Sequence, residues 1–348
     1  MLEFLLAPFS LDIGIDLGTA NTLVYVRGKG VIIREPSVVA IHRKTDTVLA
    51  VGSEAKKMVG KTPSNISSIR PLREGVVSDF EATERMLKYF LRKVHQIPSK
   101  FPRVPRPKVV IGIPSGVTDV ERRAVRDAAL QSGAREAYLI EEPLGAALGA
   151  DLPVEEPEGS LIVDVGGGTT EIAIISLGGI VVGKSLRVAG DRLNEAIVDY
   201  AREQHNLLLG DQSAEKVKMQ IGNAFPVDNG EDEFSGAVMR GRDLVTGLPK
   251  EITLSRSGAR EALSVPLVTI VGAVRDVIEA APPELLSDVL QKGITLVGGG
   301  SLLAGLDKYL AREASVPVRT VEDPASCVAR GCGKLLENSR LLKQIAVE

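Results

Sequence analysis

Two segments of this chain combine an aspartate with a turn of small residues. The first reads IGIDLGTANT (residues 13–22), the second reads LIVDVGGGTT (residues 161–170), and their starts lie 148 positions apart. Small residues let the backbone approach an anion and direct successive N–H groups at it, so phosphate is a natural occupant. Asp16 and Asp164 can hold Mg²⁺ through water, because this ion prefers oxygen ligands and keeps part of its hydration shell. Two such turns facing each other would grip a triphosphate from both sides.

A third glycine run supports this interpretation. Residues 298–301 read GGGS and follow an apolar stretch at 294–297 that we expect to be a strand. α/β sheets place ligands at the carboxyl ends of their strands, so this run is a candidate ligand contact. Each motif alone also has a structural explanation: the aspartate turns as plain β-hairpins, and the glycines as a cap or close packing site. The run is not a G-x-G-x-x-G fingerprint, which argues against an NAD enzyme.

Two further carboxylates, Glu141 and Glu142, lie between an expected strand and a helix that begins near Pro143. A carboxylate at a helix N-terminus is worth roughly 0.3–1 kcal/mol through the helix dipole, so capping is one explanation. The other is that Glu142 orients the water that attacks a γ-phosphate. Phosphoryl transfer needs positioning and charge stabilisation more than a strong base, so a carboxylate of modest basicity suffices.

The elements that must position these residues alternate between strand and helix, which indicates an α/β architecture. Each aspartate turn is predicted as strand–turn–strand, at 13–26 and again from 161, which suggests a duplicated lobe. An acidic segment with two prolines, residues 151–159, is predicted to be a linker. Further strands are expected at 31–41 (interrupted by Pro36), 109–113, 137–140 and 294–297. Helices are expected at 79–94, 119–132, 143–150, 191–206, 214–221, 265–281 and 328–336.

Composition narrows the class of protein. The 348 residues are enough for two cores, and 44% hydrophobic with 25% charged residues indicates a globular chain. Aromatic residues are 3% with no Trp, and the net charge is −3, so a nucleic-acid partner is not expected. Cys327 and Cys332 are expected to be reduced thiols of a cytosolic protein. No run of about 20 apolar residues predicts a membrane span, and the N-terminus lacks the basic region of a signal peptide.

Taken together, six runs of this sequence resemble the MreB family of bacterial actins. Their order and spacing match that family from about Ile13 to Leu336, and the runs are IDLGTANT, VVIGIPSGVTDVERRAV, LIEEP, VDVGGGTTEIAIISLGGI, GRDLVTGLP and LVGGGSLLAGLD. The wider superfamily includes actin, sugar kinases and the large heat-shock chaperones. The resemblance implies an actin-like α/β fold, in which two duplicated lobes with mixed sheets flanked by helices surround a central nucleotide cleft.

Each lobe would also carry a smaller subdomain. The implied division is subdomain IA at 1–33, 75–146 and 324–348, subdomain IB at 34–74, subdomain IIA at 147–182 and 250–323, and subdomain IIB at 183–249. The helix at 328–336 would cross back to the first lobe as a hinge, and ATP would close the cleft into a filament-competent form.

The resemblance also implies roles for single residues, with ATP and Mg²⁺ as cofactors and ATP hydrolysis coupled to filament assembly as the activity. Asp16 and Asp164 would hold the metal, and Glu142, Thr169 and Asp164 would serve the catalytic step. The phosphate turns would be Gly18, Thr19, Ala20 and Asn21, and Gly166, Gly167, Gly168 and Thr169. Adenosine would lie against Gly298, Gly299, Gly300 and Ser301, with Glu215 and Lys218 contributed by the opposite lobe.

Members of this family form double antiparallel filaments at the inner face of the cell membrane, where they guide cell-wall elongation and rod shape. The resemblance therefore implies a cytoplasmic, peripheral location, with the chain itself, the membrane surface, the wall-elongation machinery and membrane-protein adaptors as partners. Candidate membrane contacts are an N-terminal apolar segment and a loop at 97–104, with side chains Leu2, Phe4, Leu5, Leu6, Phe9 and Phe101. Each contributes roughly 1 kcal/mol at the interface, so a filament would bind more firmly than a monomer. Alternatively, the first segment packs on the protein and the second is a solvated loop.

The main alternative function is a small-molecule kinase of the same fold, which requires a base near the γ-phosphate and a dedicated substrate pocket. A chaperone ATPase would require a separate peptide-binding domain, and we expect none. Two positions depart from the family pattern. Asn194, close to Arg192, stands where an acidic residue is usual, which we expect to alter charge at the cleft rim or between subunits. Glu141 stands where some relatives have Asp.

Overall fold

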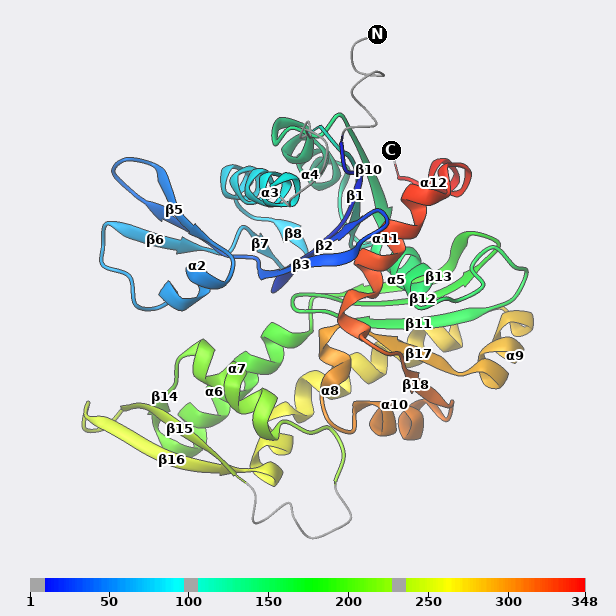
Figure 1. Ribbon diagram of the computed structural model, residues 1–348. Helices are drawn as coiled ribbons and strands as arrows, with labels where there is room; N and C mark the ends of the chain where they lie inside the picture. The colour runs from blue at the N-terminus through cyan, green and yellow to red at the C-terminus, as the bar shows by residue number, and fades with distance from the viewer. Residues whose placement is uncertain (1–9, 97–105, 227–235, 348) are drawn as a thin grey trace.

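The computed structural model describes residues 10–96, 106–226 and 236–347 and consists of two lobes (Figure 1). A five-stranded sheet forms the centre of each lobe. The first sheet has the order β3-β2-β1-β9-β10, with bounds Gly30–Pro36, Asn21–Val26, Ile13–Leu17, Lys108–Ile113 and Glu136–Glu141. The second has the order β13-β12-β11-β17-β18, with bounds Gly179–Leu186, Thr170–Ser176, Ser160–Val165, Ile294–Val297 and Val318–Thr320.

The two sheets have the same topology. In each, the first three strands in sequence form an antiparallel meander, and the last two run parallel to the first. The duplicated lobe predicted from the aspartate turns is therefore confirmed. Asp16 pairs with Gly112 and Asp164 pairs with Val297, in each case near the carboxyl ends of two parallel strands. The two aspartates therefore occupy corresponding positions at the carboxyl edges of their sheets.

Burial explains why these segments form strands. Every residue of β11 and β12 is buried, and their apolar stretches at 161–163 and 172–175 are typical of sheets that are covered on both faces. In the first lobe, helix α3 (Phe80–His95) buries an apolar stripe that includes Met86, Leu87, Phe90 and Leu91. The Asp79 side chain caps α3 by accepting from the Ala82 N–H, and Thr118 and Glu121 form a capping box at the start of α4 (Asp119–Gln131).

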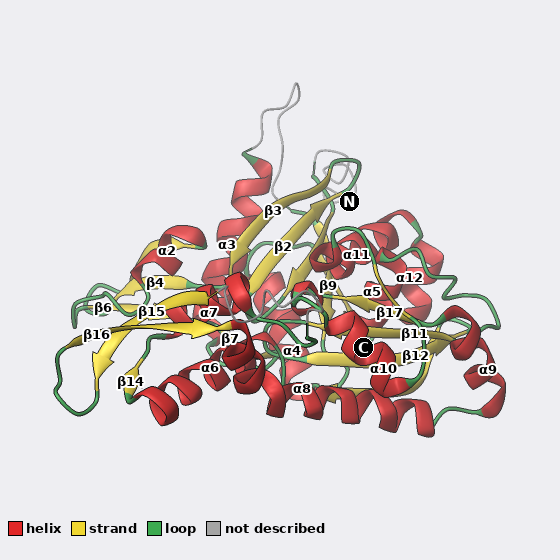
Figure 2. Cartoon of the chain, turned by 90° about the horizontal axis from the view of Figure 1, so that it is seen from below, coloured by secondary structure: helices red, strands yellow, loops and turns green. Residues whose placement is uncertain are grey.

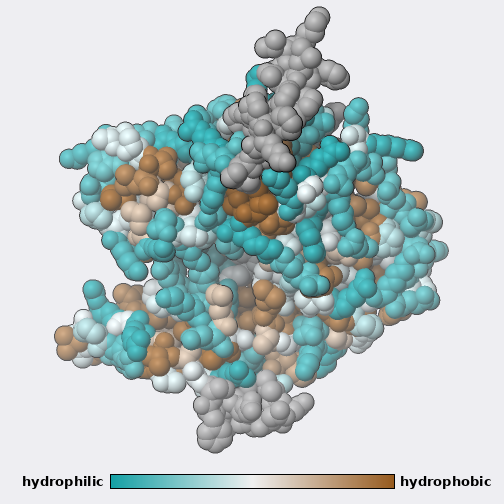
Figure 3. All heavy atoms as spheres, viewed as in Figure 1, coloured by the Kyte–Doolittle hydropathy of each residue, from teal (hydrophilic) through white to brown (hydrophobic). Residues whose placement is uncertain are grey.

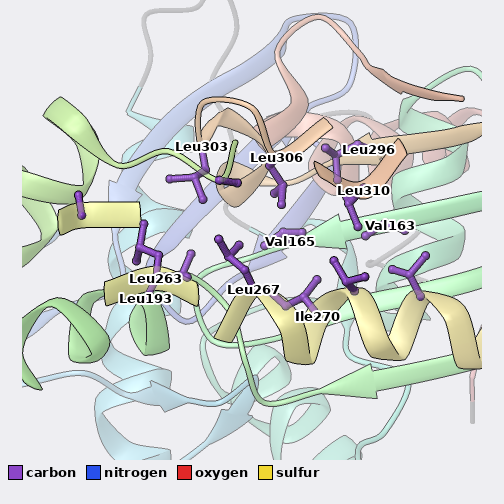
Figure 4. Packing of buried hydrophobic residues seen from close by; sticks show 14 of the residues in the cluster. Val163, Val165, Leu193, Leu263, Leu267, Ile270, Leu296, Leu303, Leu306 and Leu310 are labelled. Carbon is purple, nitrogen blue, oxygen red and sulfur yellow. The ribbon is translucent and has the colours of Figure 1, made fainter. Parts of the chain in front are cut away.

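The second lobe is covered by a larger set of helices. They are α6 (Gly190–His205), α7 (Asp211–Ile221), α8 (Arg256–Glu279), α9 (Pro283–Lys292) and α10 (Leu306–Ala314). Figure 4 shows Leu267 and Ile270 of α8 facing Val165 of β11, with Leu263 of α8 beside Leu193 of α6, all within one buried cluster. Two short 3-10 helices, η2 (Gly299–Leu302) and η3 (Pro324–Ser326), follow β17 and β18.

Helix α8 begins nine residues before the predicted start at Val265. The Ser255 side chain accepts from the Gly258 N–H and caps the helix there, and Pro266 lies inside it. The sequence prediction placed Pro266 in the first turn, where proline is tolerated, and was therefore wrong about this boundary.

Each lobe also carries small peripheral elements that the sequence did not resolve. The first lobe has β4 (Val39–His42), β5 (Thr47–Val51), β6 (Ile66–Ile69), α2 (Ser53–Met58) and the hairpin β7 (Leu72–Arg73) with β8 (Val76–Val77). The second has β14 (Leu207–Leu208), β15 (Gly236–Asp243) and β16 (Pro249–Ser255). Figure 2 shows both small sheets at the same end of the molecule.

Two helices join the lobes, α5 (Glu142–Gly149) and α11 (Cys327–Glu337), and α12 (Ser339–Ile345) follows α11. They share a buried cluster with Val110 of the first sheet and Ile162 of the second. The two helices approach so closely that a Cβ on Gly331 would overlap the Gly145 carbonyl oxygen, and one on Gly149 would overlap the Cys327 carbonyl oxygen. Cys327 and Cys332 lie on α11, and both are free and buried, as expected.

Candidate active site

The two aspartate turns meet each other between the lobes. A Cβ on Gly167 would lie 2.5 Å from the Ala20 Cβ, and one on Gly168 would overlap the Thr19 hydroxyl. Any side chain at these glycines would therefore force the turns apart. The structure thus brings the two predicted phosphate turns to one place.

Local hydrogen bonds fix the shape of each turn. The Ser37 hydroxyl donates to the Gly18 carbonyl at 2.6 Å, and the Ser37 N–H donates to the Ala20 carbonyl at 3.0 Å. In the second turn, the Gly166 N–H donates to the Thr169 carbonyl at 2.9 Å. The start of α6 also supports the second turn, because the Gly190 and Asp191 N–H groups donate to the Gly166 and Gly167 carbonyls at 3.1 and 2.7 Å.

The β7–β8 hairpin covers both turns at a single glycine. The Gly75 N–H donates to the Thr19 hydroxyl at 2.9 Å, and Gly75 has a φ of 80°. A Cβ on Gly75 would lie 2.7 Å from Pro114 Cγ and from Thr169 Cγ2. Nothing in the sequence pattern singled out Gly75, because its partners are distant in the chain.

Carboxylates gather at the same sheet edges. Asp164 is 7% exposed and Glu142 is 9% exposed, while Asp16 is partly buried. Burial raises the pKa of Asp16 to about 7, and burial with the nearby charges of Asp16 and Glu171 raises the pKa of Asp164 to about 8. Burial, then the charges of Glu171, Asp16 and Asp164, also raises the pKa of Glu142. The site therefore favours a bound cation, which relieves this repulsion.

Glu171 is a member of this cluster that the sequence analysis missed. It is 1% exposed and accepts from the Ser185 hydroxyl at 2.5 Å and from the Ser115 N–H of the first lobe at 3.2 Å. Burial raises its pKa, although both hydrogen bonds oppose the shift. Side chains alternate along a strand, and β12 pairs Glu171 directly with Asp164, so the hairpin register could have indicated it.

These shifts predict how the stability of the protein without ligand depends on pH. The folded-state pKa values of Asp16 and Asp164 lie above the ordinary value of 3.8, so their stabilising effect is complete below that value. It is lost as pH rises through about 7 and about 8. We expect the melting temperature of the ligand-free protein to fall from about pH 4 to about pH 8 and to level off above that, and Mg-ATP to reduce this fall. A melting series over this range, unchanged by Mg-ATP, would contradict the assignment.

The third glycine run packs against the second aspartate. Gly298 has a φ of 83°, and a Cβ there would overlap the Asp164 carboxylate and the Val165 carbonyl. Its N–H donates to the Pro324 carbonyl at 3.0 Å, and the Ser301 hydroxyl donates to the Gly298 carbonyl at 2.7 Å. The run therefore meets a close-packing requirement and also lies beside the second phosphate turn, with Gly299 exposed and Gly300 partly exposed.

Glu215 and Lys218 lie on α7, which packs in the second lobe with α6 and α8. The expectation that they come from the lobe opposite Gly298 was wrong, because both sets belong to the second lobe. Lys218 donates to the Gly190 carbonyl at 2.7 Å, and burial lowers its pKa. Glu215 forms an ion pair with Lys56 of the first lobe, with 2.8 Å between Nζ and Oε2.

The residue types fit magnesium and phosphate. Within the described ranges, no three His, Cys, Asp or Glu side chains converge tightly enough to hold a metal directly. Asp16 and Asp164 instead lie near the carboxyl ends of β1 and β11, close enough that, besides burial, the charge of Asp16 raises the pKa of Asp164, and two such carboxylates suit an ion that keeps several of its waters. The turns at 18–21 and 166–169 provide the small residues and glycine backbone that suit phosphate.

Comparison with known proteins decides the family. The family model described as MreB/Mbl protein matches residues 10–344. The chain belongs to the MreB/Mbl family. The cell shape-determining protein MreB of Escherichia coli (strain K12) is 50% identical over 341 residues, which cover 97% of this chain and 96% of that protein. The cell shape-determining protein Mbl of Bacillus subtilis (strain 168) is 46% identical over 330 residues, or 95% and 97%.

Solved structures show the same actin-like fold. MreB5 of Spiroplasma citri bound to ADP has a TM-score of 0.88 and 38% identity, over 97% of this chain and 98% of that chain. The MamK double helical filament has a TM-score of 0.78 and 25% identity, over 94% and 99%. The MreB/Mbl family and the actin-like fold inferred from the sequence are therefore confirmed.

The two departures from the MreB pattern differ in their surroundings. Asn194 is 8% exposed, and its Oδ1 has no hydrogen-bond partner among the residues that the structure describes. It therefore does not lie on a charged rim, contrary to the expectation. Arg192 is the exposed one, and it pairs with Glu195 on its own helix at 2.8 Å. Glu141 is half-buried, and burial raises its pKa.

The membrane candidates Leu2, Phe4, Leu5, Leu6, Phe9 and Phe101 lie outside the described residues. Among the helices that are described, none is both long and apolar enough to cross a bilayer.

Proposed function

We propose that this chain is an ATP-hydrolysing, filament-forming protein that organises cell-wall elongation and rod shape at the inner face of the cell membrane. The observation that carries the proposal is the meeting of two phosphate turns, one from each lobe, beside a cluster of buried carboxylates. The relatives named as cell shape-determining proteins support the role, and the ADP complex of MreB5 supports the nucleotide.

The residues divide the reaction between them. Backbone N–H groups of the turns at 18–21 and 166–169 would donate to phosphate oxygens, and Asp16 and Asp164 would hold Mg²⁺ through water. The ion, when bound, would neutralise charge that develops on the phosphates. Glu142 and Thr169 would orient the attacking water, and burial of both side chains limits competing solvent. Glycines 298–300, Ser301, Glu215 and Lys218 would receive the adenosine.

Assembly is the second half of the proposal. The MamK filament shows that a protein of this fold forms double filaments, and we propose the antiparallel arrangement for this chain. The N-terminal residues 1–9 and the loop at 97–104 would then contact the anionic membrane surface. Many weak contacts along one filament add up, so polymerisation and membrane binding should reinforce each other.

High-speed sedimentation tests this function. We expect the protein to pellet with Mg-ATP, to remain in solution without nucleotide, and to pellet more completely with anionic liposomes. Deleting residues 1–8 should reduce liposome binding and leave ATP turnover near normal. Sugar-stimulated ATP consumption without pelleting would instead support the small-molecule kinase. Loss of turnover after the deletion would show that the segment belongs to the folded core.

A further inference from the structure

Away from the phosphate turns, α2 of the first lobe and α7 of the second face each other (Figure 1, Figure 2), and their side chains form contacts between the lobes. Besides the Lys56–Glu215 ion pair, the Gln212 amide donates to the Lys56 carbonyl at 2.8 Å and to the Val59 carbonyl at 3.3 Å. Those carbonyls lie at the last turn of α2 and at its C-cap residue Val59, where helix carbonyls have few local partners, although the Lys56 carbonyl also accepts from the Val59 N–H at 3.2 Å. Gln212 of α7 therefore adds to the C-terminal cap of α2, while Glu215, about one turn later on α7, forms the ion pair with Lys56.

A parallel contact is made by Arg70, whose NH1 lies 3.4 Å from Asp191 Oδ1 at the start of α6. The Asp191 N–H donates to the Gly167 carbonyl in the second phosphate turn. Lys218, one turn after Glu215 on α7, donates to the Gly190 carbonyl. Arg70 therefore contacts Asp191 directly, and Lys56 is connected to Gly190 through Glu215 and Lys218 of α7. Gly190 and Asp191 are the residues that support the second phosphate turn.

We infer that Lys56 and Arg70 are positioning residues that clasp the lobes together over bound nucleotide and so slow its release. This inference rests on the proposed nucleotide-binding function. Along the clasp the charges alternate in sign, in the order Lys56, Glu215, Lys218, Asp191 and Arg70. Both cross-lobe pairs are about one-third exposed or less, at 33% and 27% for Lys56 and Glu215 and 33% and 29% for Arg70 and Asp191.

That degree of exposure suits a contact that must open and close. A fully buried ion pair would leave unpaired charges in a poorly solvated site when the lobes part. A fully exposed ion pair would add little to the stability of the closed form. Figure 3 shows hydrophilic residues along much of the edge of the gap between the lobes, together with apolar patches above and below it. The clasp therefore supplies directional, reversible contacts to a domain closure.

The rate at which a fluorescent ATP analogue is released, measured by chasing with unlabelled ATP, tests the clasp. Lys56→Glu places two carboxylates together and should speed release by about fivefold or more. The matched control is Lys57→Glu, because Lys57 pairs with Glu54 on its own helix and both are exposed. This control changes net charge equally and should leave release within about twofold. Lys56→Gln, which removes the charge without repulsion, should lie between them.

The dependence of the release rate on salt distinguishes an electrostatic role of Lys56 from a purely structural one. Raising ionic strength from about 0.05 M to about 0.5 M should bring the Lys56→Glu and Lys57→Glu release rates together, because screening weakens the new repulsion. Equal release from the two variants at low salt would overturn the inference while the proposed function stands. A wild-type protein that does not bind the analogue at all would overturn both.

Discussion

Replacing Asp164 by Asn is expected to abolish Mg-ATP-dependent assembly and, at the same time, to raise the melting temperature of the ligand-free protein. The carboxylate is 7% exposed, lies among other acids, and has a pKa raised to about 8. Its charge is therefore unfavourable without a cation, whereas a neutral amide of the same shape removes that cost. At pH 8 we expect melting to rise by about 3 °C or more.

ATP turnover and assembly should decrease in Asp164→Asn, although its melting temperature increases. Without the Asp164 charge the metal loses one of its two proposed carboxylates, and ATP turnover should fall by about 100-fold or more. Sedimentation, turnover and melting are measured on one preparation. Glu158→Gln is the control, because it removes an exposed carboxylate that pairs with Lys292, away from the turns. Normal assembly by Asp164→Asn would refute the metal role.

Replacing Gly331 by Ala should destabilise the whole molecule. The new Cβ would overlap the Gly145 carbonyl oxygen, and neither atom can rotate away because the positions of both are fixed by helix backbone. The two connecting helices would have to separate within the cluster that joins both sheets. We expect a loss of about 3 kcal/mol in the free energy of unfolding, measured by denaturant titration, with poor soluble yield.

Gly272→Ala is the matched control for that substitution. Gly272 also lies within a long helix, α8, but a Cβ there has nothing within 4 Å. Alanine at an open helical position should raise stability by about 0.5–1 kcal/mol, because it reduces the freedom of the unfolded chain and favours the helix. Equal effects at the two sites would show that the α5–α11 approach is looser than the structure indicates.

Much of the fold could be predicted because it follows from local pattern. The repeated Asp-x-Gly turns predicted two similar sheets. The apolar stripe at 79–94 predicted α3 to within one residue at each end. Strands that are buried throughout are easy to recognise where they contain an unbroken apolar stretch, as β12 does at residues 172–175. Parallel pairing then brought the chain segments around Asp16 and Asp164 to corresponding sheet edges.

The remainder depended on contacts between distant residues. The strands β15 and β16 are half-exposed and contain Gly and Pro, so their pattern resembles that of a loop. Glu171 required the register of β12 against β11, and Gly75 required the packing of a hairpin over both turns. Glu215 and Lys218 were expected opposite Gly298 from the family resemblance, whereas their helix α7 packs in the same lobe as Gly298.

A crystal structure of this chain with Mg²⁺ and a non-hydrolysable ATP analogue would decide whether one nucleotide engages both lobes. We expect phosphate oxygens to accept hydrogen bonds from backbone in both 18–21 and 166–169, with the metal's water shell reaching Asp16 and Asp164. Phosphates held by one turn alone, or a metal remote from either aspartate, would contradict the proposed site.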